Sequence, residues 1–328
     1  KNLGSLNLLK SMIIGCGRIA GQANDTGMIL SHAAAYHSND AVDLQICMDI
    51  LPAKADQFAN QYGCRAVSDI DEGLSLGRPD IISVCSPDDT HFKITRNLLQ
   101  SGYKPKVIFL EKPACSDDTE YLELLKLISR TNTTIIVNHS RRFDQHHIQL
   151  RERIQSGEFG NFYKGFTRYY SGWKHNGVHI VDTLSFLLND DLRVKNVYET
   201  QPSPYEGDST LDLKLEFAEL SGEVDVRGVD EAHYQIFELD LLFSKYRLRI
   251  EDFGQKIKLE KKVVNQIGEN VLIDVENGLT PKTKSSMQNA LDLIVRFIQD
   301  GDEQLLDGMR LKDVHSTMRT IWEAQNEA

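Results

Sequence analysis

The sequence lacks the features that mark disulfide-rich and membrane proteins. Its five cysteines are odd in number, scattered along the chain and without a CxxC pair, a pattern typical of buried thiols in a reducing compartment. No apolar run approaches the roughly 20 residues that a helix needs to span a bilayer. We therefore expect a cytoplasmic protein with no membrane partner.

Basic residues are also in deficit. The chain has 37 lysines and arginines against 48 aspartates and glutamates, a formal charge of −11. An acidic surface repels phosphate backbones and anionic lipids, so nucleic acid is a poor partner as well. The 328 residues, of which 41% are hydrophobic, are enough for two domains. This balance favours small-molecule chemistry on a two-domain protein.

Short apolar runs alternate with helix-like stretches in the first part of the chain. Strands that are separated by single helices form a parallel sheet through right-handed crossovers, with helices on both faces. The sequence therefore predicts an α/β domain over residues 1–138, a doubly wound Rossmann sheet. The five runs cover residues 11–14, 44–48, 81–84, 107–110 and 134–137.

After about residue 158, strand-like runs follow one another with only short turns between them, such as Leu220-Ser221-Gly222. Consecutive strands without intervening helices indicate a large open sheet that is mostly antiparallel. Two helical segments, 286–299 and 311–328, end the chain. We predict that residues 139–328 form an α+β domain, whose C-terminal helices can pack back on the first domain.

A glycine motif follows the first apolar run. The residues Gly15-Cys16-Gly17-Arg18-Ile19-Ala20 match G-x-G-x-x-G/A. The first glycine permits a tight turn, the second lets the backbone approach a pyrophosphate, and the small third residue lets the helix pack closely on the strand. Because alternating strands follow, the motif predicts dinucleotide binding, with Gly15, Gly17, Arg18 and Ile19 at the cofactor.

Asp49 ends the second strand-like run. An acid at this place accepts the ribose hydroxyls of NAD and repels the 2′-phosphate of NADP, so NAD is the predicted cofactor. Asp49 lies further from the glycines than the usual ~20 residues, which indicates an insertion over residues 24–36. The alternative is that Asp49 only ends a strand.

Four further motifs follow predicted strands or open a helix: Cys85-Ser86-Pro87-Asp88-Asp89-Thr90-His91, Glu111-Lys112-Pro113, Asn138-His139-Ser140-Arg141-Arg142-Phe143 and Gly177-Val178-His179-Ile180-Val181-Asp182. In this order the set resembles the Gfo/Idh/MocA family, named for glucose–fructose oxidoreductase, inositol dehydrogenase and a rhizopine-catabolism protein. The resemblance covers residues 11 to about 190 by motif and continues to the C-terminus by layout.

The resemblance implies a role for each matching residue. Glu111 would contact the nicotinamide ribose, and Lys112 would sit at the nicotinamide and the reacting carbon. His179 would be the general acid or base, and Asp182 would help to bind the sugar. The cofactor loop would contain Cys85, Pro87 and His91.

The family also implies a partner set. The substrate would be a sugar, a sugar derivative, a cyclitol or a nucleotide sugar. The sheet of the second domain often forms the subunit interface in the family, so we expect a homo-oligomer, a dimer or a tetramer.

The chemistry of alcohol oxidation needs such residues. While a hydride moves to the nicotinamide, a base takes the hydroxyl proton, and histidine has a suitable pKa. A lysine serves if burial or a neighbouring cation lowers its pKa, and otherwise its charge stabilises the developing alkoxide. We therefore predict Lys112 and His179 as the catalytic pair, and the sequence leaves open which of them is the base.

One position departs from the family pattern. Many relatives carry an aspartate four residues before the catalytic histidine, where this chain has His175, followed by Asn176. His175 is therefore a second choice as acid or base, and both are predicted substrate contacts. Trp173 can stack on a sugar ring or belong to the core. Arg142 can bind an anionic group of the substrate or form a salt bridge within its domain.

Two alternatives remain at this point. His175 and His179 have the spacing of two zinc ligands, but no third ligand is evident, so no metal is predicted. A non-catalytic NAD-binding sensor on the same fold is the alternative function. The presence of both Lys112 and His179 favours the enzyme.

Overall fold

The computed structural model describes residues 8–22 and 28–328, without the side chain of Gln22, and the chain divides into two compact units. Unit 1 contains the described residues up to Asp144 together with Lys282–His315. Unit 2 contains Gln145–Pro281 and Ser316–Ala328. The prediction divided the chain at residue 138 and allowed the C-terminal helices to pack back on the first domain. In the structure the division lies after Asp144, and Lys282–His315 belongs to unit 1.

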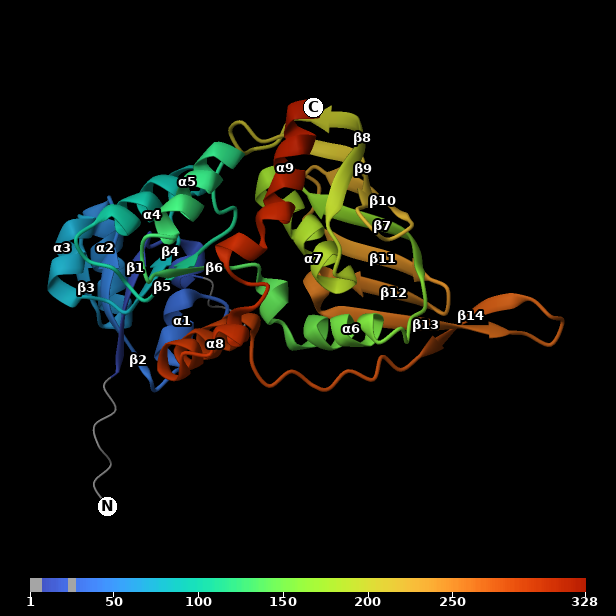
Figure 1. The fold of residues 1–328 in the computed structure, drawn as a ribbon, viewed down its shortest axis with the longest axis horizontal. Helices are drawn as coiled ribbons and strands as arrows, with labels where there is room; N and C mark the ends of the chain where they lie inside the picture. The colour runs from blue at the N-terminus through green and yellow to red at the C-terminus, as the bar shows by residue number, and fades with distance from the viewer. Residues whose placement is uncertain (1–7, 23–27) are drawn as a thin grey trace, which may run out of the picture. The chain divides into compact units, whose positions relative to one another are not determined.

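The core of unit 1 is a six-stranded sheet in the order β3-β2-β1-β4-β5-β6, and every neighbouring pair is parallel (Figure 1). Strands β4 and β5 are buried at every position, which explains their continuous apolar runs. The strands are β1 (Leu9–Ile14), β2 (Val42–Met48), β3 (Arg65–Val67), β4 (Ile81–Val84), β5 (Val107–Leu110) and β6 (Thr134–Val137). The predicted doubly wound domain is thus confirmed.

Helices cover both faces of this sheet, with α4 and α5 on one face and α1 and α8 on the other (Figure 1). The α-helices of unit 1 are α1 (His32–His37), α2 (Pro52–Tyr62), α3 (Ile70–Gly77), α4 (His91–Gln100), α5 (Asp118–Ile128) and α8 (Ser286–Asp300). The shorter helical turns are Arg18–Gln22, Asp88–Thr90, Ser140–Phe143, Glu303–Leu306 and Leu311–Asp313.

Helix α8 explains why a C-terminal segment belongs to unit 1. Ser285 begins it with a capping box to Gln288. Its buried face includes Met287, Leu291 and Ile294, which share one apolar cluster with residues of α1 and of strands β1, β2, β4, β5 and β6. Burying such a face is the main source of helix stability in proteins, so α8 stays with this core.

Unit 2 is built on an eight-stranded sheet in the order β14-β13-β12-β11-β7-β10-β9-β8. Only the pairing of β10 with β7 is parallel, so the predicted mostly antiparallel sheet is confirmed. The strands are β7 (Phe162–Tyr170), β8 (Leu192–Gln201), β9 (Thr210–Phe217), β10 (Glu223–Val229), β11 (Phe237–Phe243), β12 (Tyr246–Glu251), β13 (Lys256–Val264) and β14 (Asn270–Val275).

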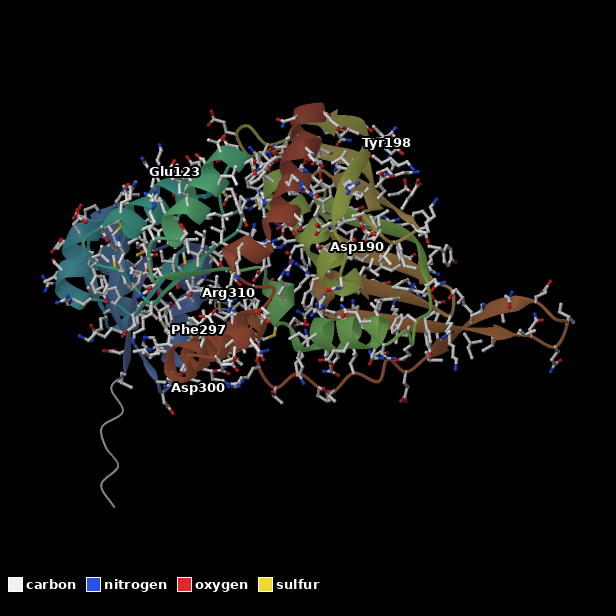
Figure 2. All side chains as sticks on the ribbon, viewed as in Figure 1. Glu123, Asp190, Tyr198, Phe297, Asp300 and Arg310 are labelled. Atoms are coloured by element: carbon white, nitrogen blue, oxygen red, sulfur yellow. The ribbon has the colours of Figure 1, made fainter. Side chains whose placement is uncertain are left out.

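The two faces of this sheet differ in chemistry. Helices α6 (Gln145–Gln155), α7 (Val178–Leu188) and α9 (His315–Glu327) lie on one side of it (Figure 1), and the alternate positions of β9 and β11 are buried. On the other face lie partly exposed side chains such as Tyr198, labelled in Figure 2, whose ring centroid is 5.7 Å from the Arg227 guanidinium. Among the described residues, no helix is long and apolar enough to cross a membrane.

Candidate functional site

The glycine loop lies between the ends of β1 and β4, where the strand order of unit 1 reverses. Gly15 has a φ of +90°, and a Cβ at this position would lie 2.6 Å from the Ser86 backbone nitrogen, so only glycine fits. At Gly17, apart from its chain neighbours, no atom of the described residues lies within 4 Å of the place of a Cβ. The open space at Gly17 fits the close approach of a pyrophosphate, and a switch point of this kind is where α/β sheets bind ligands.

The predicted pyrophosphate loop continues into a single π-helical turn, Arg18–Gln22. Ala20 in this turn is fully buried, as the small third residue of the motif requires, while Arg18 is exposed and Ile19 half-buried. The predicted insertion over residues 24–36 falls in part outside the described residues. Its described end contains α1, which Ser31 caps by accepting a hydrogen bond from the Ala34 backbone nitrogen.

Asp49 is tied to the glycine loop. Its Oδ2 accepts a hydrogen bond of 3.0 Å from the Cys16 backbone nitrogen, and its Oδ1 accepts one of 2.9 Å from Leu51. The half-buried carboxylate therefore lies at the end of β2 beside the loop, despite the long intervening sequence. An acid at this place fits a ribose and disfavours a 2′-phosphate.

His91 links the loops that follow β4 and β5. Its ring nitrogens lie 2.7 Å from the Pro113 carbonyl oxygen and 2.9 Å from the Ser86 carbonyl oxygen. Both partners are acceptors, and a neutral imidazole can donate to only one of them. His91 is 1% exposed, whereas Pro87 lies at the surface, and burial raises the pKa of the buried Cys85 thiol well above its usual range.

Glu111 stands at the end of β5 with 7% of its surface exposed. Its Oε1 accepts hydrogen bonds from Asn138 Nδ2 at 2.6 Å and lies 2.9 Å from His32 Nε2. Burial alone would raise the pKa of this carboxyl. The hydrogen bond and the electrostatic attraction of His32, the hydrogen bond of Asn138 and the charge of Lys112 together outweigh it and lower the pKa below its ordinary value. The half-buried Lys112 thus lies close enough to Glu111 for its charge to lower the pKa of that carboxyl.

In unit 2, a second carboxylate holds the segment that precedes α7. Asp208 accepts hydrogen bonds from the backbone nitrogens of Lys174, at 2.8 Å, and His175, at 2.9 Å. The His175 ring stacks on Tyr205, with centroids 4.1 Å apart. Gly172 has a φ of +81°, and a Cβ there would lie 2.7 Å from Asp208 Oδ2. Sequence reasoning missed Asp208 and Tyr205, because neither belongs to a motif.

Helix α7 carries the predicted histidine and aspartate one turn apart. His179 is half-buried, and its carbonyl oxygen accepts a hydrogen bond of 2.6 Å from Thr183 Oγ1. Asp182 is 2% exposed. The i, i+3 spacing places both residues on one side of α7. Within unit 2, the structure therefore gathers His175, His179 and Asp182 on one helical segment.

Three predicted substrate contacts are engaged inside their own units. Of the two places predicted for Trp173, a sugar contact or the core, the structure has the core: the side chain is 0% exposed, and its Nε1 donates to the Ile321 carbonyl oxygen at 3.1 Å. The Asn176 amide donates to the Ser171 carbonyl oxygen at 2.5 Å and closes its own turn. Arg142 is 7% exposed and donates to the Gly308 carbonyl oxygen at 2.6 Å.

His175 and His179 have the sequence spacing of two zinc ligands. Across residues 8–22 and 28–328, no cluster of three or more His, Cys, Asp or Glu side chains could hold a metal ion.

Comparison with known proteins adds to this geometry. Residues 9–139 match the model of the oxidoreductase family with an NAD-binding Rossmann fold, GFO_IDH_MocA. A segment of 148 residues is 33% identical to the inositol 2-dehydrogenase of Rhizobium meliloti (strain 1021) and covers 45% of this chain. The match spans 41% of that relative's length.

Solved structures resemble the whole described chain. The aldose-aldose oxidoreductase from Caulobacter crescentus, complexed with glycerol, has a TM-score of 0.77 at 15% identity and covers 98% of both chains. The WlbA dehydrogenase from Chromobacterium violaceum, in complex with NADH and UDP-GlcNAcA, has a TM-score of 0.73 at 15% identity, covering 98% of this chain and 94% of that one. At such identities the likeness shows the fold. Residues 9–139 thus match the NAD-binding Rossmann domain of the GFO_IDH_MocA oxidoreductase family.

Proposed function

We propose that this protein is an NAD(H)-dependent oxidoreductase that transfers a hydride between the nicotinamide and a hydroxyl-bearing carbon of a sugar, sugar derivative, cyclitol or nucleotide sugar. The observation that carries the proposal is the arrangement at the end of β5. There Lys112 follows a buried carboxylate whose pKa is lowered, in a domain of an NAD-binding oxidoreductase family.

The substrate class rests on the relatives. The similar proteins include an inositol dehydrogenase, an aldose oxidoreductase and a dehydrogenase in complex with a UDP-sugar. Inositols, aldoses and UDP-sugars all carry several hydroxyl groups on a carbon ring or chain. A carboxylate such as Asp182 and an imidazole such as His175 offer the hydrogen bonds that such hydroxyls need.

The preference for NAD over NADP rests on Asp49. Both of its carboxylate oxygens accept backbone hydrogen bonds, which fixes the negative charge beside the glycine loop. A 2′-phosphate would meet that charge, whereas ribose hydroxyls can donate to it. We therefore expect NADH to bind more tightly than NADPH.

We assign the proton chemistry to His179 and the charge stabilisation to Lys112. When bound, the nicotinamide supplies the hydride acceptor or donor. His179 takes the proton of the reacting hydroxyl or returns it, since an imidazole titrates near the working pH. The Lys112 ammonium stabilises the oxygen as it becomes an alkoxide. Asp182 and His175 orient the neighbouring hydroxyls.

Two further properties belong to the proposal. The five cysteines are free thiols, which suits a cytoplasmic enzyme. We also expect a homo-oligomer, a dimer or tetramer, because the family often uses the large sheet for subunit contacts.

The test begins with fluorescence titration of the purified protein with NADH and NADPH. Cyclitols, aldoses, glycosides and UDP-sugars are then screened for NADH formation with the wild type and with Lys112→Ala and His179→Ala. Loss of a general acid–base residue costs about 10²- to 10⁴-fold in turnover. We expect NADH binding in all three proteins and turnover only in the wild type.

Matched controls come from the same two units. Lys106→Ala removes a lysine from the opposite end of β5, where it pairs with Asp80 at 3.0 Å, and His233→Ala removes an exposed histidine of unit 2. Both controls should keep full turnover. NADH binding without turnover on any compound would favour a sensor instead, and failure to bind either nucleotide would refute the proposal.

A further inference from the structure

Five buried polar side chains of unit 1 form one hydrogen-bonded chain that ends at Glu111. The Tyr36 hydroxyl lies 2.6 Å from Ser83 Oγ, which lies 2.8 Å from His32 Nδ1. His32 Nε2 lies 2.9 Å from Glu111 Oε1, and Asn138 Nδ2 donates to the same oxygen at 2.6 Å. The chain connects α1 with β4 and with the ends of β5 and β6.

The hydrogen bond to Glu111 has a fixed direction. An ionised carboxylate can only accept, so His32 Nε2 carries a hydrogen and donates it to Glu111 Oε1. Burial raises the pKa of Tyr36, so its phenol stays protonated within the chain.

The His32 ring is held in place from its sides as well. It is 1% exposed, and its centroid lies 4.7 Å from that of Phe109 on β5. A polar network in such surroundings is strong when every member is satisfied and costly when one is missing. The orientation of His32, and with it that of Glu111, is thus set by packing and hydrogen bonding together.

In the Glu111 carboxylate, one oxygen therefore accepts both of these hydrogen bonds, and the other oxygen accepts neither of them. Oε1 of Glu111 receives both hydrogen bonds, so the plane of the group is fixed and Oε2 takes part in neither. The charged or titratable groups that face this carboxylate from the neighbouring elements are His32 on α1, Cys85 after β4 and Lys112 after β5.

We propose that His32 is a positioning residue: through its Nε2–H it fixes the orientation and the negative charge of Glu111, which in turn contacts the bound nucleotide and the Lys112 ammonium. The nucleotide contact rests on the proposed function, whereas the effect on Glu111 does not. His32 lies outside every sequence motif and acts through a carboxylate 79 residues away.

The test replaces His32 by two residues of opposite character. His32→Phe keeps an aromatic ring against Phe109 and removes both nitrogens, whereas His32→Gln keeps an amide donor for Glu111. Thr133→Val is the control, because it removes one buried hydrogen bond, 2.7 Å to the Pro105 carbonyl oxygen, at the opposite edge of the same sheet. Near-ultraviolet circular dichroism verifies the native fold of each variant.

Two readouts follow. Infrared spectroscopy across a pH titration, with Glu111→Gln to assign the band, reports the ionisation of Glu111. NADH fluorescence reports nucleotide affinity. In His32→Phe we expect Glu111 to protonate at higher pH and NADH to bind at least about tenfold more weakly, since a hydrogen bond to a charged group is lost. The NADH affinity of this variant should also fall as the solution becomes acidic.

His32→Gln should recover most of both properties, and Thr133→Val should leave both at wild-type values. Unchanged ionisation of Glu111 in natively folded His32→Phe would overturn the inference, whatever happens to NADH. Unchanged NADH affinity with altered ionisation would overturn the nucleotide contact. Failure of the wild type to bind NADH would refute the proposed function and leave the ionisation test of His32 intact.

Discussion

Each unit contains a buried carboxylate, and the two are held in opposite ways. Glu111 in unit 1 is bound by side chains, His32 and Asn138, and its pKa is lowered. Asp208 in unit 2 is bound by two backbone amides, those of Lys174 and His175, and its pKa is raised because burial outweighs those bonds. The two groups are equally inaccessible, with 7% of each residue exposed.

The difference teaches what burial does to a charge. Removing a carboxylate from water disfavours its ionised form, and only close donors and opposite charges can offset that. Glu111 has side-chain donors and Lys112, so it keeps a permanent charge beside the proposed nucleotide contact. Asp208 has amides and weaker charges around it, and it serves mainly to hold the turn that presents His175.

The largest expected effect comes from removing Glu111. Glu111→Ala leaves the donors of His32 and Asn138 without this acceptor, so the free energy of unfolding should fall by about 3–5 kcal/mol. Urea denaturation followed by circular dichroism measures the loss. Glu123→Ala is the control, because Glu123, labelled in Figure 2, pairs with Arg96 at the surface and should lose less than about 1 kcal/mol. Equal losses would mean that the network around Glu111 contributes no special stability.

Asp208→Ala should have a smaller effect. The substitution leaves two backbone amides unpaired in a buried turn, and we expect a loss of about 2 kcal/mol in the free energy of unfolding. Asp190, labelled in Figure 2, provides a control, because this half-buried carboxylate accepts three backbone amides, at 3.0, 2.8 and 2.8 Å, through hydrogen bonds that are exposed to solvent. Water can replace the carboxylate of Asp190, so Asp190→Ala should cost less. A larger loss for Asp190 would refute the role of burial.

Much of the fold could be predicted from the sequence because it rests on local pattern. The buried strands β4 and β5 read as apolar runs, and the polar alternation of β9 and β11 indicated an antiparallel sheet. Strand β3 has three residues and one buried position, which gives too little signal to detect. The membership of α8 in unit 1 depends on packing against residues far away in the sequence, which no local pattern reports.

The candidate site likewise contains residues that local motifs predict and residues that only long-range contacts reveal. Motifs predicted Gly15, Asp49, Glu111 and Lys112. Each of these residues comes directly after a strand of the parallel sheet or one residue later, and the ends of parallel strands meet at one edge of the sheet. Their supporting residues could not be found in this way. His32 bonds to a side chain 79 residues away, and Asp208 bonds to a backbone 33 residues away. For Trp173 the sequence left a substrate contact and a core position both open, because an aromatic residue has the same sequence signal in a core and in a binding site.

The smallest effect expected from the comparison of Glu111 with Asp208 is on the pH dependence of the free energy of unfolding. The pKa of Glu111 lies below its ordinary value of 4.5, so its ionisation stabilises the fold above that pH, and this stabilisation is lost as the pH falls through the folded-state pKa. The pKa of Asp208 lies above its ordinary value of 3.8. Its contribution to stability is therefore complete below that pH and declines as the pH rises through the folded-state pKa.

Glu111→Gln and Asp208→Asn, with the wild type beside them, separate the two contributions, because each variant lacks one titrating group. Urea unfolding is measured from neutral to acidic pH, and each variant is subtracted from the wild type. The advantage of the wild type over Glu111→Gln should shrink as the pH falls, while its advantage over Asp208→Asn should grow. Parallel slopes would show that the two carboxylates experience burial alike and that the partners of Glu111 do not set its charge. Opposite slopes would mean that the side chains of His32 and Asn138, with the charge of Lys112, keep Glu111 ionised. They would also mean that the two backbone amides leave Asp208 closer to its neutral form.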